Sequence, residues 1–183
     1  MNQKTFDVIV AGGGTAGAIA GLAAARNGAR TLIVEKNRCL GGQFTAGMMG
    51  AWVGFSDKLH RCVGGIAWEL RNILNELGAV VDEDPETDVC YLYDTEVAKV
   101  VLADLAAREP NLTTYLNTQI VDVLQVGDTL SGLVILSEME LMEVRAEMIV
   151  DCTGDAAVAA KAGVPCEIRP KKEIQPMSLV GKM

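Results

Sequence analysis

The chain has 183 residues, of which 50% are hydrophobic and 4% aromatic, enough for one hydrophobic core rather than two. Its net charge of −8 argues against nucleic-acid binding, because that binding depends on Lys and Arg side chains that neutralise phosphates. Five cysteines without a C-x-x-C pair give little support to a metal site or dithiol chemistry, and they favour reduced thiols in a cytoplasmic protein.

The N-terminal segment predicts a strand, a tight glycine turn and a helix. Residues 6–11 (FDVIVA) are apolar and β-branched, as expected for a strand buried on both faces, and residues 15–27 have a helical Ala/Leu pattern. Between them, Gly12, Gly14 and Gly17 fit the G-x-G-x-x-G motif. The first permits the sharp turn, the second lets the backbone approach a pyrophosphate, and the third lets the helix pack close to the strand. The amides of the first helical turn then face the phosphates.

A membrane helix is the main alternative for this segment. Residues 8–25 contain no charge, and Gly13, Gly17 and Gly21 have the small-xxx-small spacing of packed membrane helices. Three consecutive glycines, however, weaken any helix by about 1 kcal/mol each relative to alanine. The chain also lacks the basic start and cleavage site of a signal peptide. We therefore expect neither a membrane span nor a leader, and the apolar strand before the glycines argues against a flexible linker.

A second strand, residues 30–35 (RTLIVE), ends in an acid. Glu35 follows Gly17 at close to the spacing of about 20 residues expected for a carboxylate that accepts hydrogen bonds from ribose hydroxyls. A carboxylate at this place disfavours a 2′-phosphate, so NADP is not expected. The motif alone leaves both NAD and FAD open.

Two further segments extend the pattern. Residues 37–50 (NRCLGGQFTAGMMG) follow the second strand, and residues 148–163 (MIVDCTGDAAVAAKAG) lie near the other end. Together with GGGTAG at 12–17 and Glu35-Lys36, they resemble the FAD-dependent oxidoreductase family with the glutathione-reductase type of FAD domain, related to the fumarate reductase and succinate dehydrogenase flavoproteins. The resemblance spans essentially the whole chain.

The resemblance implies FAD as cofactor and a Rossmann-like three-layer α/β fold for an FAD/NAD(P)-binding domain, with a parallel sheet and an inserted antiparallel β-meander. Segment 40–47 is expected beside the pyrophosphate and flavin, 153–155 at a second strand end, and the backbone of Ile120 near adenine. The alternative for Gly41 and Gly42 is an ordinary surface turn. The residues expected to contact FAD are Gly12, Gly14, Thr15, Ala16, Gly17, Glu35, Lys36, Gly41, Gly42, Gln43, Thr45, Ile120, Thr153, Gly154 and Asp155.

The middle of the chain predicts the remaining elements. Residues 64–77 have the apolar spacing of an amphipathic helix, 82–88 form an acidic loop, and Asp94 can cap a helix over 95–108. Strands are expected at 112–116, 119–126, 130–137, 140–145 and 147–151, of which the second to fourth form the meander.

The resemblance also implies how the chain is divided and what it does. Residues 1–163 are expected to form the FAD-binding domain and 164–183 the start of a missing or truncated substrate part, which a second chain or a homo-oligomer supplies. Flavin N5 is expected to accept a hydride from an unknown small substrate. The alternative is a non-catalytic NAD- or FAD-binding module or an inactive remnant. No catalytic residue is identified. Cys39 is a candidate redox thiol near the flavin, and His60 is a candidate acid/base or flavin attachment point, with an ordinary loop residue as the alternative for His60.

Overall fold

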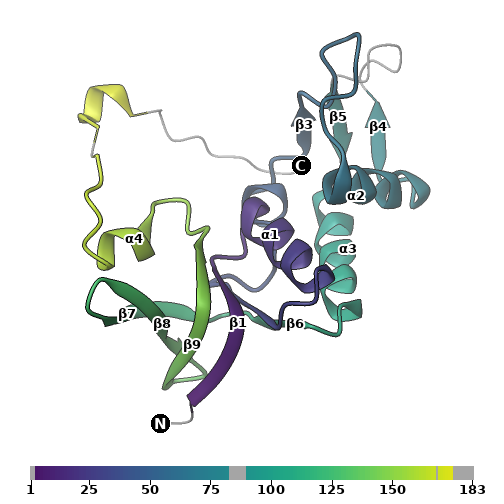
Figure 1. The fold of residues 1–183 in the computed structure, drawn as a ribbon. Helices are drawn as coiled ribbons and strands as arrows, with labels where there is room; N and C mark the ends of the chain where they lie inside the picture. The colour runs from purple at the N-terminus through teal and green to yellow at the C-terminus, as the bar shows by residue number, and fades with distance from the viewer. Residues whose placement is uncertain (1–2, 83–89, 168, 175–183) are drawn as a thin grey trace.

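The computed structural model describes residues 3–82, 90–167 and 169–174. A six-stranded sheet forms the centre of the fold (Figure 1). Its strands, in spatial order, are β6 (Leu112–Tyr115), β2 (Thr31–Val34), β1 (Gln3–Ala11), β9 (Glu140–Asp151), β8 (Thr129–Ser137) and β7 (Gln119–Val126). The first four pair in parallel and the last three in antiparallel fashion, so the sheet combines a parallel half with a meander.

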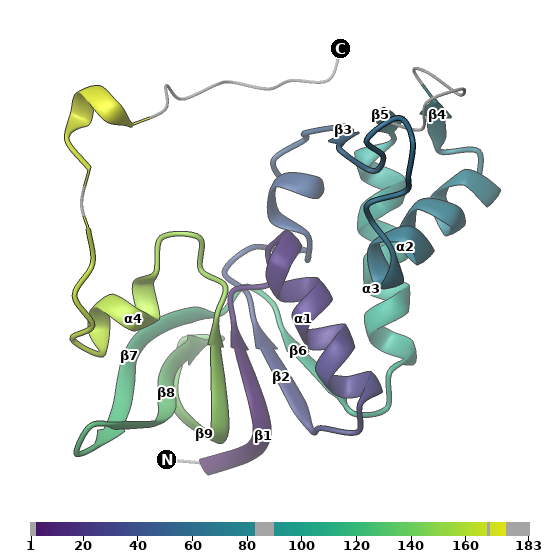
Figure 2. The ribbon, with the colours of Figure 1, turned by 45° about the horizontal axis from the view of Figure 1, so that its top comes forward.

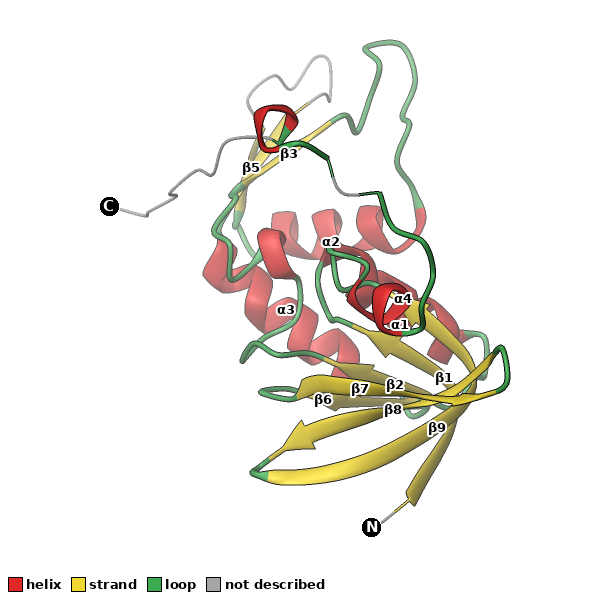
Figure 3. Ribbon diagram, turned by 90° about the vertical axis from the view of Figure 1, so that its left-hand side faces the viewer, coloured by secondary structure: helices red, strands yellow, loops and turns green. Residues whose placement is uncertain are grey.

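The two faces of the parallel strands are covered by different layers. Helices α1 (Thr15–Arg26), α2 (Gly65–Glu76) and α3 (Thr95–Arg108) lie on one side of the sheet (Figure 3). Val10 and Ile33 pack on that side in a core cluster with helix residues such as Leu102. Ile9 belongs instead to a cluster with meander residues such as Leu133. Alternate residues of the parallel strands thus point to opposite faces, one towards the helices and the other towards the meander. The helices, the parallel strands and the meander form three layers, which confirms the predicted fold.

The end of the meander differs from the prediction. Two strands were expected over 140–145 and 147–151, but β9 is one continuous strand. Its first half pairs with β8, from Glu140 to Arg145, and the strand pairs with β1 from Glu143 to Asp151. The chain contains no turn residue at this point, and Ala146 pairs directly with Phe6. The third meander strand and the final parallel strand are therefore the same strand.

A second, three-stranded sheet was not predicted. It consists of β3 (Ala51–Val53), β5 (Cys90–Tyr93) and β4 (Val80–Asp82), paired in antiparallel fashion in that order. Figure 2 shows it next to α2 and α3, away from the six-stranded sheet. Strands of three or four residues are too short to give a readable alternation. Most of the predicted acidic loop, from residue 83 onward, lies outside the described residues.

The helices follow their sequence signals closely. The Asp94 side chain accepts hydrogen bonds from the amides of Glu96 and Val97 at 2.8 and 3.3 Å, so α3 begins at the predicted cap. Short helical segments follow at η1 (Gly42–Phe44), α4 (Ala157–Lys161) and η2 (Lys171–Glu173). The uncharged stretch of residues 8–25 is divided between β1 and α1. No helix among the described residues is both long and apolar enough to cross a membrane.

Helix α1 rests directly on the turn that precedes it. A Cβ atom added to Gly17 would overlap the carbonyl oxygen of Gly12, which is backbone and cannot move aside. The predicted role of Gly17, close packing of the helix against the strand, therefore has a direct geometric basis.

We expect Gly17→Ala to lower the free energy of unfolding by about 2–3 kcal/mol, because overpacking exceeds the gain in helix propensity. Urea unfolding measures the effect. Gly64→Ala is the control, since a Cβ atom at Gly64 meets no atom within 4 Å and its φ is −138°. It should change stability by less than about 1 kcal/mol. Equal effects of the two substitutions would contradict the packing role of Gly17.

Candidate cofactor site

The turn between β1 and α1 has a closed side and an open side. Gly12 has φ +94°, donates its amide to the carbonyl oxygen of Val34 at 2.8 Å, and lies against Cys152, whose oxygen would be 2.6 Å from an added Cβ atom. Gly14 has an ordinary φ of −61°, and a Cβ atom there meets no atom within 4 Å. Gly12 and Gly17 are thus required by the fold, whereas Gly14 faces open space that a ligand can occupy.

The N-terminus of α1 lies at this open side. Gly14 is the N-cap, no side chain caps the helix there, and its first turn contains no acidic residue. Thr15 and Ala16 are exposed at the same end. A helix N-terminus in this state attracts an anion through its amides and its dipole. The open face at Gly14 and the uncapped helix therefore fit a pyrophosphate.

Glu35 lies at the end of β2 and is only 4% exposed. Its Oε2 atom accepts a hydrogen bond from the Gly13 amide at 2.6 Å. Its Oε1 atom accepts two from Asn37, from the backbone amide at 2.8 Å and from Nδ2 at 2.6 Å. The carboxylate therefore holds the glycine turn itself, a role that the sequence analysis did not foresee. A carboxylate has about four acceptor positions, so one remains for a ribose hydroxyl. Lys36, directly after it, is exposed.

The second glycine segment lies against the first. Gly41 donates its amide to the Gly13 carbonyl at 2.8 Å, and its own carbonyl accepts the Thr15 hydroxyl, also at 2.8 Å. Gly41 and Gly42 both have positive φ, +103° and +54°, so the turn depends on glycine. The two glycine segments therefore form one continuous backbone surface.

The remaining residues of this loop are placed differently from one another. Gln43 is exposed, so its side chain is accessible to a ligand. Thr45 is fully buried, its hydroxyl donates to the Leu40 carbonyl, and its amide donates to the Gly42 carbonyl at 3.1 Å. Its polar groups are therefore used inside the loop, which does not support the predicted cofactor contact.

The third predicted segment follows β9 and is organised by Asp151. The Asp151 carboxylate accepts hydrogen bonds from the Thr153 amide at 3.0 Å and hydroxyl at 2.7 Å, and from the amides of Val158 and Ala159 at 3.0 and 2.9 Å. The Thr153 hydroxyl in turn accepts the Ala157 amide at 2.8 Å. Both side chains are therefore used inside the segment, and the sequence analysis missed Asp151.

The acidity of Asp151 reflects these bonds. Partial burial raises its pKa, but the hydrogen bonds from Thr153, Ala159 and Val158 outweigh burial and leave the pKa below the ordinary value of 3.8. The carboxylate is thus ionised while it holds the segment. Gly154, with φ +86°, and exposed Asp155 form the outer part of the segment.

The residues directly before β7 reach the same sheet edge. Thr118 donates its amide to the Glu35 carbonyl at 3.0 Å, and Asn117 donates to the Asn37 carbonyl at 3.0 Å. Ile120 lies two residues further along, and its side chain packs against the meander core. All predicted site residues therefore surround the carboxyl ends of β1, β2 and β9, the edge at which open parallel sheets bind ligands.

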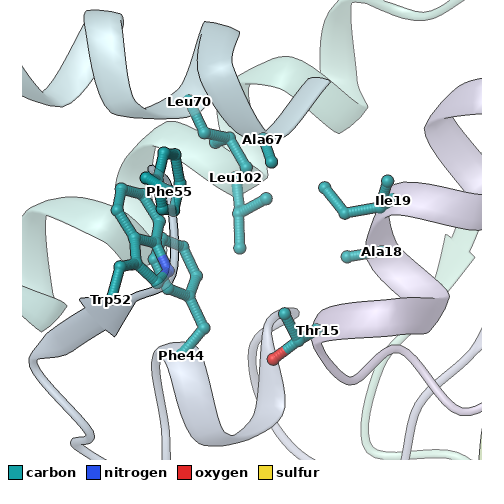
Figure 4. A pocket seen from close by; sticks show the side chains of 9 residues that line it. All are labelled: Thr15, Ala18, Ile19, Phe44, Trp52, Phe55, Ala67, Leu70 and Leu102. Carbon is teal, nitrogen blue, oxygen red and sulfur yellow. The ribbon is translucent and has the colours of Figure 1, made fainter. Parts of the chain in front are cut away.

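An apolar pocket adjoins this edge on the helical side (Figure 4). It has a volume of about 210 Å³. One wall is aromatic: the Phe44 and Trp52 rings stack with centroids 4.7 Å apart, and Phe55 lies 5.3 Å from Trp52. The full lining is Thr15, Ala18, Ile19, Phe44, Trp52, Phe55, Ala67, Leu70 and Leu102. The pocket was not predicted, since its aromatic residues belong to segments without clear periodicity.

The two candidate catalytic residues, His60 and Cys39, do not have surroundings that indicate catalysis. His60 is exposed in a loop, with Nδ1 3.5 Å from Asp57 Oδ2. Cys39 is half-buried, and its Sγ atom lies 3.9 Å from the Thr45 hydroxyl. Neither arrangement assigns a catalytic role.

We expect Glu35→Gln to lower the free energy of unfolding of the cofactor-free protein by about 1–3 kcal/mol, because an amide nitrogen would face backbone donors. Chemical unfolding without added cofactor measures this. Unchanged stability of the cofactor-free variant would contradict the turn-holding role and leave only a ribose role.

Asp151→Asn should likewise lower the free energy of unfolding at neutral pH, by about 1–2 kcal/mol. The pKa of Asp151 is lowered on folding, so the stability that the carboxylate contributes is present above about pH 4 and is lost as the pH falls through the folded pKa. The difference between the natural protein and the variant should therefore shrink below pH 4. A difference that stays constant from pH 6 to pH 3 would contradict this role.

The curated proteins that are similar to this chain include two that match most of its length. The digeranylgeranylglycerophospholipid reductase of Picrophilus torridus is 26% identical over 192 residues, which cover 94% of this chain and 45% of that protein. The thiamine thiazole synthase of Aeropyrum pernix is 33% identical over 171 residues, which cover 85% of this chain and 57% of that protein. The chain thus spans about half the length of these relatives.

A solved structure and a family model complete the comparison. The geranylgeranyl bacteriochlorophyll reductase-like protein of Thermoplasma acidophilum has a TM-score of 0.66 at 22% identity, covering 88% of this chain and 43% of that chain, which shows the same fold. The family model described as FAD dependent oxidoreductase matches residues 7–183. The chain therefore belongs to the FAD-dependent oxidoreductase family, and its predicted cofactor, FAD, is confirmed by that membership.

Proposed function

We propose that the chain forms the FAD-binding part of a flavin-dependent oxidoreductase that takes a hydride from a small substrate. The observation that carries this proposal is the open face at Gly14, where an uncapped helix N-terminus meets a second glycine turn. FAD, when bound, supplies the redox chemistry, since its N5 atom takes up the hydride that the substrate gives up.

The residues of the chain bind and orient the cofactor. The amides that follow Gly14 hold the pyrophosphate at the N-terminus of α1. The free acceptor position of Glu35 takes a ribose hydroxyl, because its other positions hold the turn. The backbone at Gly41 and Gly42 and the segment 153–155 extend the binding surface towards the flavin ring. The backbone at Ile120, near the start of β7, would contact the adenine.

The catalytic acid or base, in this proposal, is supplied by residues outside 1–163. The chain spans about half the length of the curated relatives, which supports a division into an FAD-binding part and a substrate part beginning after residue 163. We propose that turnover requires further polypeptide, either from the same protein or from an associated subunit.

The experiment that tests the oxidoreductase proposal is spectroscopic. The purified protein is loaded with FAD, candidate reductants are added without oxygen, and the visible flavin bands are followed. Bleaching by a specific small substrate supports the proposal. The test uses the whole protein, with any further domains. If that protein binds FAD but no reductant bleaches the flavin bands, the result would favour a non-catalytic nucleotide-binding module instead.

Gly14→Val should abolish FAD binding and leave the fold intact. The φ of −61° suits any residue, and an added Cβ atom meets no protein atom within 4 Å, so the side chain extends into the space assigned to the pyrophosphate. Flavin content measures binding, and circular dichroism measures the fold. Gly64→Val is the matched control, the same exchange at the open N-cap of α2, and should retain FAD. A folded Gly14→Val protein with full flavin content would refute the pyrophosphate assignment.

A further inference from the structure

The pocket beside the glycine turns is chemically uniform. None of its nine lining residues is charged, and its only polar side-chain atoms are Thr15 Oγ1 and Trp52 Nε1. The Thr15 hydroxyl already donates to the Gly41 carbonyl, which leaves its methyl group for the pocket (Figure 4). A charged or strongly polar group placed here would lose its hydration and gain almost no partner. The lining therefore selects an uncharged hydrocarbon group.

The volume limits what can enter. Whole small-molecule sites occupy about 300–1,000 Å³, which exceeds the 210 Å³ of this pocket. An apolar cavity of about 150 Å³ is known to admit benzene, so this pocket suits roughly eight to ten carbon atoms. It is sized for one end of a larger molecule, not for the whole of it.

The position of the pocket connects it with the cofactor surface. Thr15 belongs to the first turn of α1, directly after the open glycine, and Phe44 ends the short helix η1, which begins at Gly42. The two sides of the pocket are thus continuous with the two glycine turns. A hydrocarbon group bound against Phe44 lies next to the place proposed for FAD, with its remaining part free to reach that edge.

We propose that this pocket binds the uncharged hydrocarbon end of the substrate. The inference rests on the proposed oxidoreductase function and narrows its substrate to molecules with an apolar chain or ring of this size. The aromatic wall of Phe44, Trp52 and Phe55 supplies the contact surface on one side, and Ala18 and Ile19 of α1 supply it on the other.

Trp52 allows the binding to be observed directly. The chain has two tryptophans, so Trp68→Phe leaves Trp52 as the single reporter in the pocket wall. Titration with 1-octanol should give a saturable change of its emission. The comparison probe is 1,8-octanediol, which has a hydroxyl group at both ends, so one of them must enter the apolar pocket. It should therefore bind about tenfold more weakly than 1-octanol. Equal affinities, or no saturable change, would overturn the proposal.

A second measurement does not depend on the tryptophan variant. Binding of 1-octanol to the natural protein should raise its Tm saturably, because a ligand that binds only the folded state stabilises it. Ala67→Phe fills the pocket from α2 and should weaken this effect at least about tenfold, and Ala67→Leu is the smaller substitution if the first does not fold. Ala103→Phe, on the exposed face of α3, is the matched control and should bind 1-octanol normally. Undiminished binding by a folded Ala67→Phe protein would overturn the assignment.

Flavin content, measured on the same samples, separates the two proposals. Protein that binds FAD but not 1-octanol would refute the hydrocarbon pocket and leave the oxidoreductase proposal standing. Protein that binds 1-octanol at this pocket but never FAD would support the hydrocarbon site and contradict the proposed function.

Discussion

The structure depends on the close approach of three backbone segments at Gly12. The end of β1, the start of α1 and the residue after β9 meet there without an intervening side chain, and Cys152 also donates its amide to the Ala11 carbonyl at 2.8 Å. A side chain at either Gly12 or Gly17 would force these segments apart. Since the same contact sets the direction of the helix N-terminus, the packing of the fold and the geometry of the cofactor site are inseparable.

Two carboxylates stabilise this arrangement from inside. Glu35 holds the first glycine turn, and Asp151 holds the segment after β9, each by accepting several backbone amides. Hydrogen bonds to an ionised acceptor are stronger than neutral ones, and here they fix turns that no hydrophobic contact could define. Both turns are therefore held by groups of the chain itself, and such preorganisation reduces the entropy lost on binding.

Local signals account for what the sequence could predict. The glycine spacing marks the β1–α1 turn, and Asp94 marks the start of α3, because both features depend on neighbouring residues. The features that were not predicted depend on residues far apart in the sequence. β9 continues through Ala146 because β1 pairs with it there. The Glu35 carboxylate accepts the Gly13 amide only once the chain has folded. The aromatic pocket likewise joins segments that share no periodic pattern.

The double use of β9 has a consequence for how the protein forms. Gln3 pairs with Glu143, so β1 obtains this neighbour only after about 140 further residues have been added to the chain. At roughly 5–20 residues per second, β1 waits for about ten seconds or more with one edge unpaired. Such long-range pairing also slows folding, because loop-closure entropy is lost before the contact forms. The sheet edge that carries the glycine turns is therefore completed only once β9 has been added to the chain.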